Sequence, residues 1–331
     1  MPPIVRKSVT GRVRVNPRSL LLELLLAATV VGASTRVAAD DRGGNLAAAL
    51  KGHVRALTGT AEPRNYQAMD SLDAAAGYIE GRLKACGLTP VKQEFVIQGK
   101  TFRNIVARIG NGSKKTVIVG AHYDVWGPGP GADDNASGVA GLLELARLAN
   151  AHKAQLACNV EIVAYANEEP PFFRTNQMGS YVHAQSWLNR KSAIDHVIVL
   201  EMIGYFSGKD GSQAYPLQAM KQAYPTAGDF IAVVGNIPSS PAAERIKQAV
   251  LKNSKIGCQT LIGPPALKGI DFSDHLNYWA LGLTAVMVTD TSFYRNPNYH
   301  KKSDTPETLD YQKMGEVVKG IAASLRPDAR Q

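Results

Sequence analysis

The stretch GAHYDVWGPGPGADDNASG, residues 120–138, decides how the rest of the chain is interpreted. It follows a β-branched apolar run, residues 116–119, and precedes the amphipathic run GVAGLLELARLA. A strand that ends at a histidine, a Gly/Pro-rich loop that carries carboxylates, and then a helix are typical of a ligand site at the carboxyl edge of an α/β sheet. We interpret the stretch as half of a two-metal centre.

Three side chains in this stretch are candidate site residues. His122 and Asp134 are the proposed metal ligands. Asp124 lies two residues after His122, so on an extended chain both side chains point to the same side and the carboxylate can accept the second N–H of the imidazole. Such a motif alone is more often a surface turn with a chance His and Asp. The other ligands must therefore come from the remaining sequence.

The net charge of the chain does not indicate a nucleic-acid partner. The 331 residues carry a formal charge of +9, with 45% hydrophobic and 20% charged residues, which is a globular composition. Residues 1–39 hold six basic residues and one acidic residue, so the remainder is only +4. The excess positive charge thus belongs mostly to the N-terminal segment, and we exclude nucleic acid as a partner.

The N-terminal segment, residues 1–39, has the layout of a secretory signal peptide. A basic region precedes the apolar run Leu20–Ala33, and small residues precede a possible cleavage site after Ala39. Glu23 inside the apolar run opposes membrane insertion, and the run is short for a spanning helix. We therefore expect a secreted or periplasmic protein. A membrane-anchored protein, in contact with the membrane only through this uncleaved segment, and a cytoplasmic one are the alternatives.

The three cysteines lack the paired spacing of a zinc ribbon or of a disulfide framework; they are Cys86, Cys158 and Cys258. At most one bridge could form among them. We expect all three to be small buried hydrophobic residues.

The order of elements predicts one three-layer α/β/α domain over residues 40–331, with a mixed, mostly parallel sheet. Two helices, 45–60 and 66–86, precede strands at 90–98, 102–109 and 116–119. From Gly138 strands and helices alternate, and continuous apolar strands that alternate with helices indicate a parallel sheet covered on both faces. The expected helices are 138–151, 179–190, 241–253 and 310–325, and the expected strands are 159–166, 196–204, 229–235 and 284–290.

Acidic residues follow two of these apolar strands. Glu168 and Glu169 come directly after the strand at 159–166, and Glu201 lies in the strand at 196–204. Together with His122, these residues place ligand-type side chains at the same end of three strands. A carboxylate is costly to bury at such a position without a cation, so the coincidence favours a metal site.

A last segment, NPNYHKKSDT, adds His300 after Tyr299. Two histidines, one bridging aspartate and two glutamates can give each of two ions an imidazole and carboxylates, with a position left for water. Because two imidazoles are present and thiolates are absent, we expect two catalytic Zn²⁺ ions, with Co²⁺ or Mn²⁺ as substitutes.

With these residues in place, the chain resembles the M28 family of di-zinc aminopeptidases from about residue 50 to 325. The motifs that carry the resemblance are HYD, GADDNASG, NEE, LEMIGY, SDH and NPNYH, in this order. The resemblance implies that one zinc is held by His122, Asp134 and Glu201. It implies that the other zinc is held by Asp134, Glu169 and His300. One departure is Glu201, where many members carry aspartate, and this bears on metal spacing and substrate range rather than on the chemistry.

The resemblance also implies a mechanism. Glu168 is the expected general base that converts a metal-bridging water into hydroxide, and Tyr299 is expected to stabilise the oxyanion. The expected substrates are peptides with a free N-terminus. Asp124, Asp274 and Asp304 are expected to lie behind the ligands, and His275 is as compatible with a structural role as with a site role. The peptide bond Asp134–Asn135 is expected to be cis.

Three other readings remain open. A glutaminyl cyclase-like acyltransferase with one zinc is expected to have Ser after the metal-binding Asp and Trp before the last His, where this chain has Asn135 and Tyr299. A peptidase of the M20 type needs an inserted lid domain, for which little room exists between Glu201 and His300. A non-catalytic peptidase-like binding domain would have lost metal ligands, whereas the set here is complete.

Overall fold

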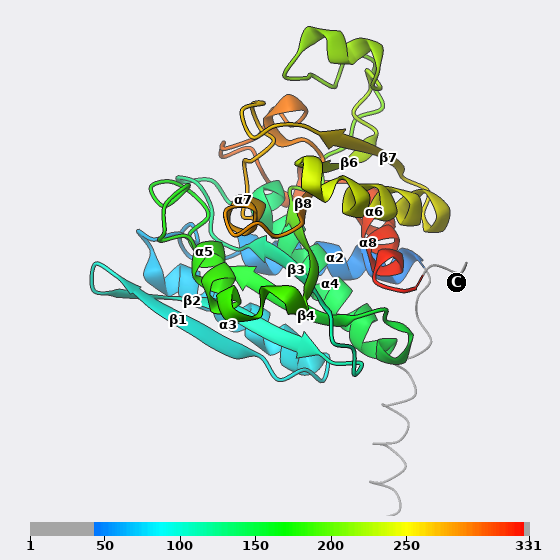
Figure 1. Cartoon of the computed structure of the whole chain (residues 1–331). Helices are drawn as coiled ribbons and strands as arrows, with labels where there is room; N and C mark the ends of the chain where they lie inside the picture. The colour runs from blue at the N-terminus through cyan, green and yellow to red at the C-terminus, as the bar shows by residue number, and fades with distance from the viewer. Residues whose placement is uncertain (1–42, 328–331) are drawn as a thin grey trace, which may run out of the picture. The chain divides into compact units, whose positions relative to one another are not determined.

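The computed structural model describes residues 43–327, and these are organised around one eight-stranded sheet with the order β1-β2-β4-β3-β5-β8-β6-β7 (Figure 1). Strands β4, β3, β5 and β8 run parallel to one another, and β2 is antiparallel both to its neighbour β4 and to the edge strand β1. At the other edge β6 is antiparallel to β8 but parallel to β7. The strands are β1 (Val91–Ile97), β2 (Lys100–Ile109), β3 (Thr116–His122), β4 (Asn159–Tyr165), β5 (Ile194–Glu201), β6 (Phe230–Gly235), β7 (Gly257–Ile262) and β8 (Ala285–Thr289).

Helices cover both faces of the sheet. One face packs against α2 (Gly43–Thr58), α3 (Met69–Ala85), α4 (Gly138–Ala151), α6 (Ser240–Asn253) and α8 (Tyr311–Ser324). The opposite face packs against α5 (Gly179–Ser186) and α7 (His275–Trp279). Successive residues of β3 alternate between the two cores, since Val117 and Val119 join the first and Ile118 joins the second. The expected three-layer α/β/α architecture with a mixed sheet is confirmed.

Burial on both faces explains why the central strands are continuously apolar. Every residue of β3 is buried. Within this strand only glycine fits at position 120, because an added Cβ atom would lie 2.2 Å from the ring of Tyr165. Close contact between β3 and β4 thus brings His122, at the end of β3, next to the turn that follows β4.

The element boundaries expected from the sequence agree with the structure to within a few residues, with three exceptions. Strand β7 and the short helix α7 were not expected. The helix expected over 179–190 ends at Ser186 and is followed by a 3₁₀ turn at Leu188–Ala193.

The cysteine prediction is wrong for two of the three residues. Cys258 is buried, but Cys86 and Cys158 are only half-buried, and all three are free thiols. Within residues 43–327, no helix is long and apolar enough to cross a membrane. The expected signal peptide, residues 1–39, lies outside the described residues.

Candidate metal centre

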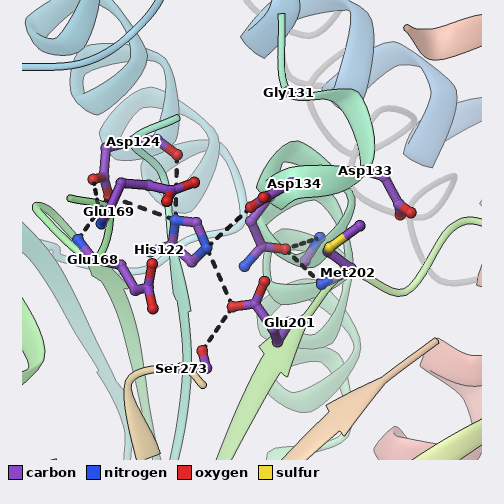
Figure 2. Close-up of polar contacts among 12 residues, drawn as sticks. His122, Asp124, Gly131, Asp133, Asp134, Glu168, Glu169, Glu201, Met202 and Ser273 are labelled. Carbon is purple, nitrogen blue, oxygen red and sulfur yellow. Dashed lines mark hydrogen bonds and ion pairs between the residues drawn. The ribbon is translucent and has the colours of Figure 1, made fainter. Parts of the chain in front are cut away.

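The predicted ligands of the central strands meet at one edge of the sheet. His122 is the last residue of β3, Glu201 is the last residue of β5, and Glu168 and Glu169 follow β4 after a short turn. Figure 2 shows these side chains in one cluster, in which dashed lines join His122 to Asp134 and to Glu201. The carboxyl ends of neighbouring parallel strands lie side by side, so residues distant in sequence form one cluster.

The first group of potential ligands consists of His122, Asp134 and Glu201, all buried. The Nε2 atom of His122 lies 3.5 Å from Oδ1 of Asp134 and 3.2 Å from Oε2 of Glu201. One ligand atom from each residue lies within 4.8 Å of the other two, which is close enough for a single ion to contact all three.

The second group consists of Asp134, Glu169 and His300. The Nε2 atom of His300 lies 3.1 Å from Oδ2 of Asp134 and 3.5 Å from Oε2 of Glu169. Asp134 therefore presents one carboxylate oxygen to each group. Glu168 belongs to neither group, although its carboxylate is buried beside them.

The residues present fit a pair of cations. Both imidazole Nε2 atoms, of His122 and His300, and Oε1 of Glu169 are buried without a hydrogen-bond partner among the described residues. Buried polar atoms that lack partners are costly, and a bound cation would satisfy all of them. Imidazole and carboxylate donors without thiolates suit zinc in a site that leaves a position open.

The pKa values of the site residues also indicate that the cluster lacks positive charge. Burial, together with the neighbouring Asp134 carboxylate, raises the pKa of Glu169 to about 8. Burial also raises the pKa of Glu168 well above its usual range, although the nearby His122 opposes the shift. For His300 burial acts to lower the pKa, but the adjacent carboxylates of Asp134 and Glu169 raise it to about 10. Crowded carboxylates without a cation thus hold protons that metal binding would displace.

Two aspartates support the ligands through backbone amides. Asp124 accepts hydrogen bonds from the backbone N–H groups of Glu168 and Glu169, each at 3.1 Å. Its Oδ1 atom also lies 3.5 Å from Nδ1 of His122. Asp304 accepts bonds from the backbone N–H groups of Asp133 (2.9 Å) and Asp134 (3.1 Å). The aspartates thereby position both the turn after β4 and the turn that carries Asp134.

The other predicted residues lie around this cluster. Asp274 is fully buried, and burial raises its pKa to about 7. The ring of Tyr299 stacks on His300 with centroids 3.7 Å apart. His275 points to the backbone, since Nε2 lies 2.8 Å from the carbonyl oxygen of Ile270, and its ring packs edge-on against Trp279. Its contacts are therefore those of a structural histidine.

The side chain of Asn135 holds the turn around Asp134 in place. The Asp134–Asn135 peptide bond is cis, as predicted. The Asn135 side chain donates to the carbonyl oxygen of Leu200 and accepts from the N–H of Met202, both next to Glu201. These two hydrogen bonds link the turn that carries Asp134 to the end of β5, where Glu201 lies.

Sequence reasoning missed two side chains of the site. The hydroxyl of Ser273 donates to Oε2 of Glu201 at 2.6 Å, as Figure 2 shows. Its position directly before Asp274 in the SDH motif was the available signal. Arg64 is buried against the loop that follows His122, and nothing in its sequence context, a polar turn, indicated this.

A cavity of about 220 Å³ opens beside the ligands. The ligand side contributes carboxylates, whereas the rest is lined mainly by apolar and aromatic side chains. These come from one face of β6, β7 and β8 and from the loops around it, and include Phe230, Val234, Leu261, Phe272, Met287 and Phe293. Lys268 also lines the cavity and lies 5.6 Å from the centre of the Phe293 ring.

The fold and the site define a class of protein, namely three-layer α/β/α domains with two adjacent groups of potential metal ligands at the carboxyl edge of the sheet. Residues 104–325 match the model of Peptidase family M28, and the chain belongs to this family.

The similar proteins differ in how much of their own length this chain covers. The chain is 46% identical over 284 residues to the uncharacterized protein YfbL of Escherichia coli (strain K12), covering 83% of this chain and 86% of YfbL. It is 30% identical over 265 residues to the probable lipoprotein aminopeptidase LpqL of Mycobacterium tuberculosis, covering 72% of this chain and 48% of LpqL. It is 27% identical over 280 residues to a probable leucine aminopeptidase of Trichophyton verrucosum, covering 79% of this chain and 66% of that relative.

Solved structures share the fold. The LapA aminopeptidase of Legionella pneumophila superimposes with a TM-score of 0.63 at 18% identity, covering 86% of this chain and 74% of LapA. A glutaminyl cyclase of Bacteroides thetaiotaomicron gives a TM-score of 0.60 at 20% identity, covering 84% and 97%. The family match and the named relatives confirm the M28 resemblance and the expected enzyme class, metallo-aminopeptidase.

Proposed function

We propose that this chain is a zinc-dependent aminopeptidase that removes the N-terminal residue of peptides. The observation that carries the proposal is the pair of ligand groups that share Asp134, next to a buried carboxylate, Glu168, that belongs to neither. A carboxylate beside a metal pair, but not needed to bind it, suits a general base in hydrolysis. Family membership and the names of the relatives support the same reaction.

His122, Asp134 and Glu201 would hold one zinc ion, and Asp134, Glu169 and His300 would hold the second. When bound, the ions supply Lewis acidity, which polarises the scissile carbonyl group and lowers the pKa of water.

Glu168 performs the proton transfers. Its carboxylate takes a proton from the attacking water while the water oxygen bonds to the carbonyl carbon. The protonated Glu168 then gives this proton to the leaving amine nitrogen as the C–N bond breaks, which releases a free amino acid and a shortened peptide. Burial raises the pKa of Glu168 in the metal-free site, and bound cations would lower it toward the carboxylate form that the first transfer needs.

Tyr299 stabilises the negative charge that develops on the carbonyl oxygen. Its side chain lines the same cavity as Glu168 and Glu169. Burial and the surrounding carboxylates raise its pKa, so the phenol remains protonated and can donate a hydrogen bond.

The cavity beside the ligands receives the side chain of the N-terminal residue. Its lining is predominantly apolar, which favours large apolar side chains. Lys268 among the lining residues disfavours a lysine or arginine side chain. The carboxylates at the ligand end attract the positively charged α-amino group, which favours removal of single N-terminal residues over internal cleavage.

The decisive experiment is an assay of aminoacyl-p-nitroanilides and N-blocked peptides with and without a metal chelator. We expect hydrolysis of unblocked leucyl and phenylalanyl substrates, none of blocked ones, and loss of activity with chelator that zinc restores. Activity that persists in a protein shown to be metal-free would refute the proposal.

Two neighbouring variants test the division of roles. Glu168→Gln keeps the shape of the side chain but removes the base, so turnover should fall by at least about a hundredfold with zinc content unchanged. Glu169→Ala should lose one zinc ion, and added zinc should restore activity only in part. Loss of zinc in the first variant and retention of both ions in the second would reverse the assignment.

A second candidate is a glutaminyl cyclase-like activity, because a glutaminyl cyclase is among the solved structures with this fold. Asn135 and Tyr299 stand where cyclases are expected to have Ser and Trp, which favours hydrolysis. Mass spectrometry of peptides that begin with glutamine separates the two, since cyclisation releases ammonia and leaves the peptide bonds intact.

We also propose that the protein is exported, on the basis of the basic, apolar and small-residue order of residues 1–39. N-terminal sequencing of the protein from its native host should find a start near Asp40. An intact Met1 in cytosolic protein would contradict export.

A further inference from the structure

Arg64 packs against the loop that connects His122 to Asp134, and we propose that it is a positioning residue for the zinc ligands. The proposal rests on the zinc-dependent function proposed above. Arg64 lies in the turn between α2 and α3, where a charged residue would normally be solvated, yet its side chain is only 1% exposed. A buried guanidinium is costly unless its donors are used, so its partners define what it does.

Three of the four backbone carbonyl oxygens that accept from the guanidinium lie at the two ends of the loop, and the fourth is that of Leu57 in α2, 3.4 Å from Nη1. Nε donates to Tyr123 at 2.8 Å, directly after His122. Nη2 donates to Gly131 at 2.6 Å, and Nη1 donates to Pro130, both shortly before Asp134. Because the guanidinium is planar and rigid, these bonds fix the distance between the two ends of the loop.

The backbone next to Arg64 adds to this attachment. The carbonyl oxygen of Arg64 accepts a bond from the N–H of Val125 at 3.2 Å, and the amide of Asn65 donates to Gly127 at 3.0 Å. On the other side, Asp304 accepts from the N–H of Asp134. The turn that presents the shared ligand Asp134 is therefore held by an arginine from one side and an aspartate from the other. In Figure 2 Gly131 marks where this turn begins.

The charge of Arg64 and its positioning role predict opposite effects of its removal on zinc affinity. Burial lowers the pKa of Arg64 only to about 10, so the side chain is a cation at neutral pH among the acids of the site. A fixed cation near two Zn²⁺ ions repels them, so charge alone predicts that its removal strengthens zinc binding. Positioning predicts that its removal weakens zinc binding, because the ligands then lose their fixed spacing.

The experiment measures zinc affinity of metal-free protein in competition with a chromophoric chelator. We compare the wild type with Arg64→Met, which removes charge and donors, and Arg64→Lys, which keeps the charge but cannot span both ends of the loop. Both variants should bind zinc about 10- to 100-fold more weakly. The loss of zinc affinity should be larger at the ligand group that contains His122 than at the group that contains His300. The reason is that His122 and Asp134, two ligands of the first group, flank the loop that Arg64 holds.

Asn65→Ala is the matched control. It removes a bond to the same loop, but at Gly127 in the middle, away from both ligand-bearing ends. Its zinc affinity should stay within about threefold of wild type, well below the usual effect of a residue that orients a ligand.

Wild-type affinity in either Arg64 variant, tighter binding in Arg64→Met, or an equal loss in Asn65→Ala would each overturn the proposal. If Arg64→Met does not fold, Arg64→Lys decides alone. Failure of both variants to fold even with saturating zinc would assign Arg64 to the folding of the whole domain and would also overturn it. A wild type that binds zinc but cleaves no peptide would refute the proposed function and leave this comparison valid.

Discussion

Replacement of Gly120 by alanine should destabilise the protein by about 2–4 kcal/mol. The added Cβ atom would lie 2.2 Å from Cε2 and 2.4 Å from the hydroxyl oxygen of Tyr165. Carbon atoms in contact normally lie about 3.5–4.0 Å apart, so the ring must move by more than roughly 1 Å. Tyr165 is fully buried and its hydroxyl lies 2.7 Å from that of Tyr278, so movement also strains this hydrogen bond. Overpacking costs about 1–3 kcal/mol and the weakened hydrogen bond about 1 kcal/mol more.

Urea unfolding of matched variants measures this cost. In a Tyr165→Leu background the ring is absent, so Gly120→Ala should cost about 1–2 kcal/mol less than in the wild type. Gly52→Ala is the control, because it lies on the exposed face of α2 with nothing within 4 Å of the new Cβ atom, and it should stabilise the protein by about 0.5–1 kcal/mol. An equal cost of Gly120→Ala in both backgrounds would refute the packing argument.

Three further predictions concern single side chains. Ser273→Ala removes the hydroxyl that donates to Glu201, so zinc affinity measured against a chelator should fall about tenfold; an unchanged affinity would contradict a role in orienting this ligand. Burial lowers the pKa of His275 from 6.5 to about 4. Between these two pH values the imidazole is protonated in the unfolded chain but stays neutral in the folded protein. The stability that the neutral ring provides is thus present above pH 6.5 and lost as the pH falls to 4, by at most about 3 kcal/mol. His275→Gln, which can still donate toward Ile270, should show a shallower loss in urea unfolding over this window, and parallel curves would count against the argument. Burial raises the pKa of Cys258 to about 12, so a thiol reagent at pH 8 should leave this residue unmodified in the native protein, as mass mapping can check.

The elements that could be predicted from the sequence are those whose burial produces a recognisable pattern of apolar residues along the chain. The strand at 116–122 is buried on both faces, and a continuous apolar run is what such burial requires. Strand β7 could not be predicted in the same way, because Gln259 and Thr260 interrupt the apolar pattern. It forms because β6 offers a backbone edge for pairing, and this edge exists only in the folded sheet.

The same distinction holds for the site. Ligands at strand ends were predictable, because parallel strands place their carboxyl ends together. The half-buried state of Cys86 and Cys158 and the burial of Arg64 were not predictable. Arg64 is buried because a loop distant in sequence supplies carbonyl oxygens for its donors, and no local pattern encodes that loop's position.

The order of the site residues along the chain has a consequence for biosynthesis. Helix α8 packs against α2, where Leu46 lies 3.7 Å from the position of a Cβ atom on Gly315, and His300 and Asp304 lie in the segment between β8 and α8. A growing chain that has reached residue 290 already holds His122, Glu169 and Glu201, but it lacks His300 and the aspartate that supports the turn of Asp134. The second ligand group is therefore incomplete until almost the whole domain has been synthesised, and the proposed peptide-cleaving activity begins only at that late stage.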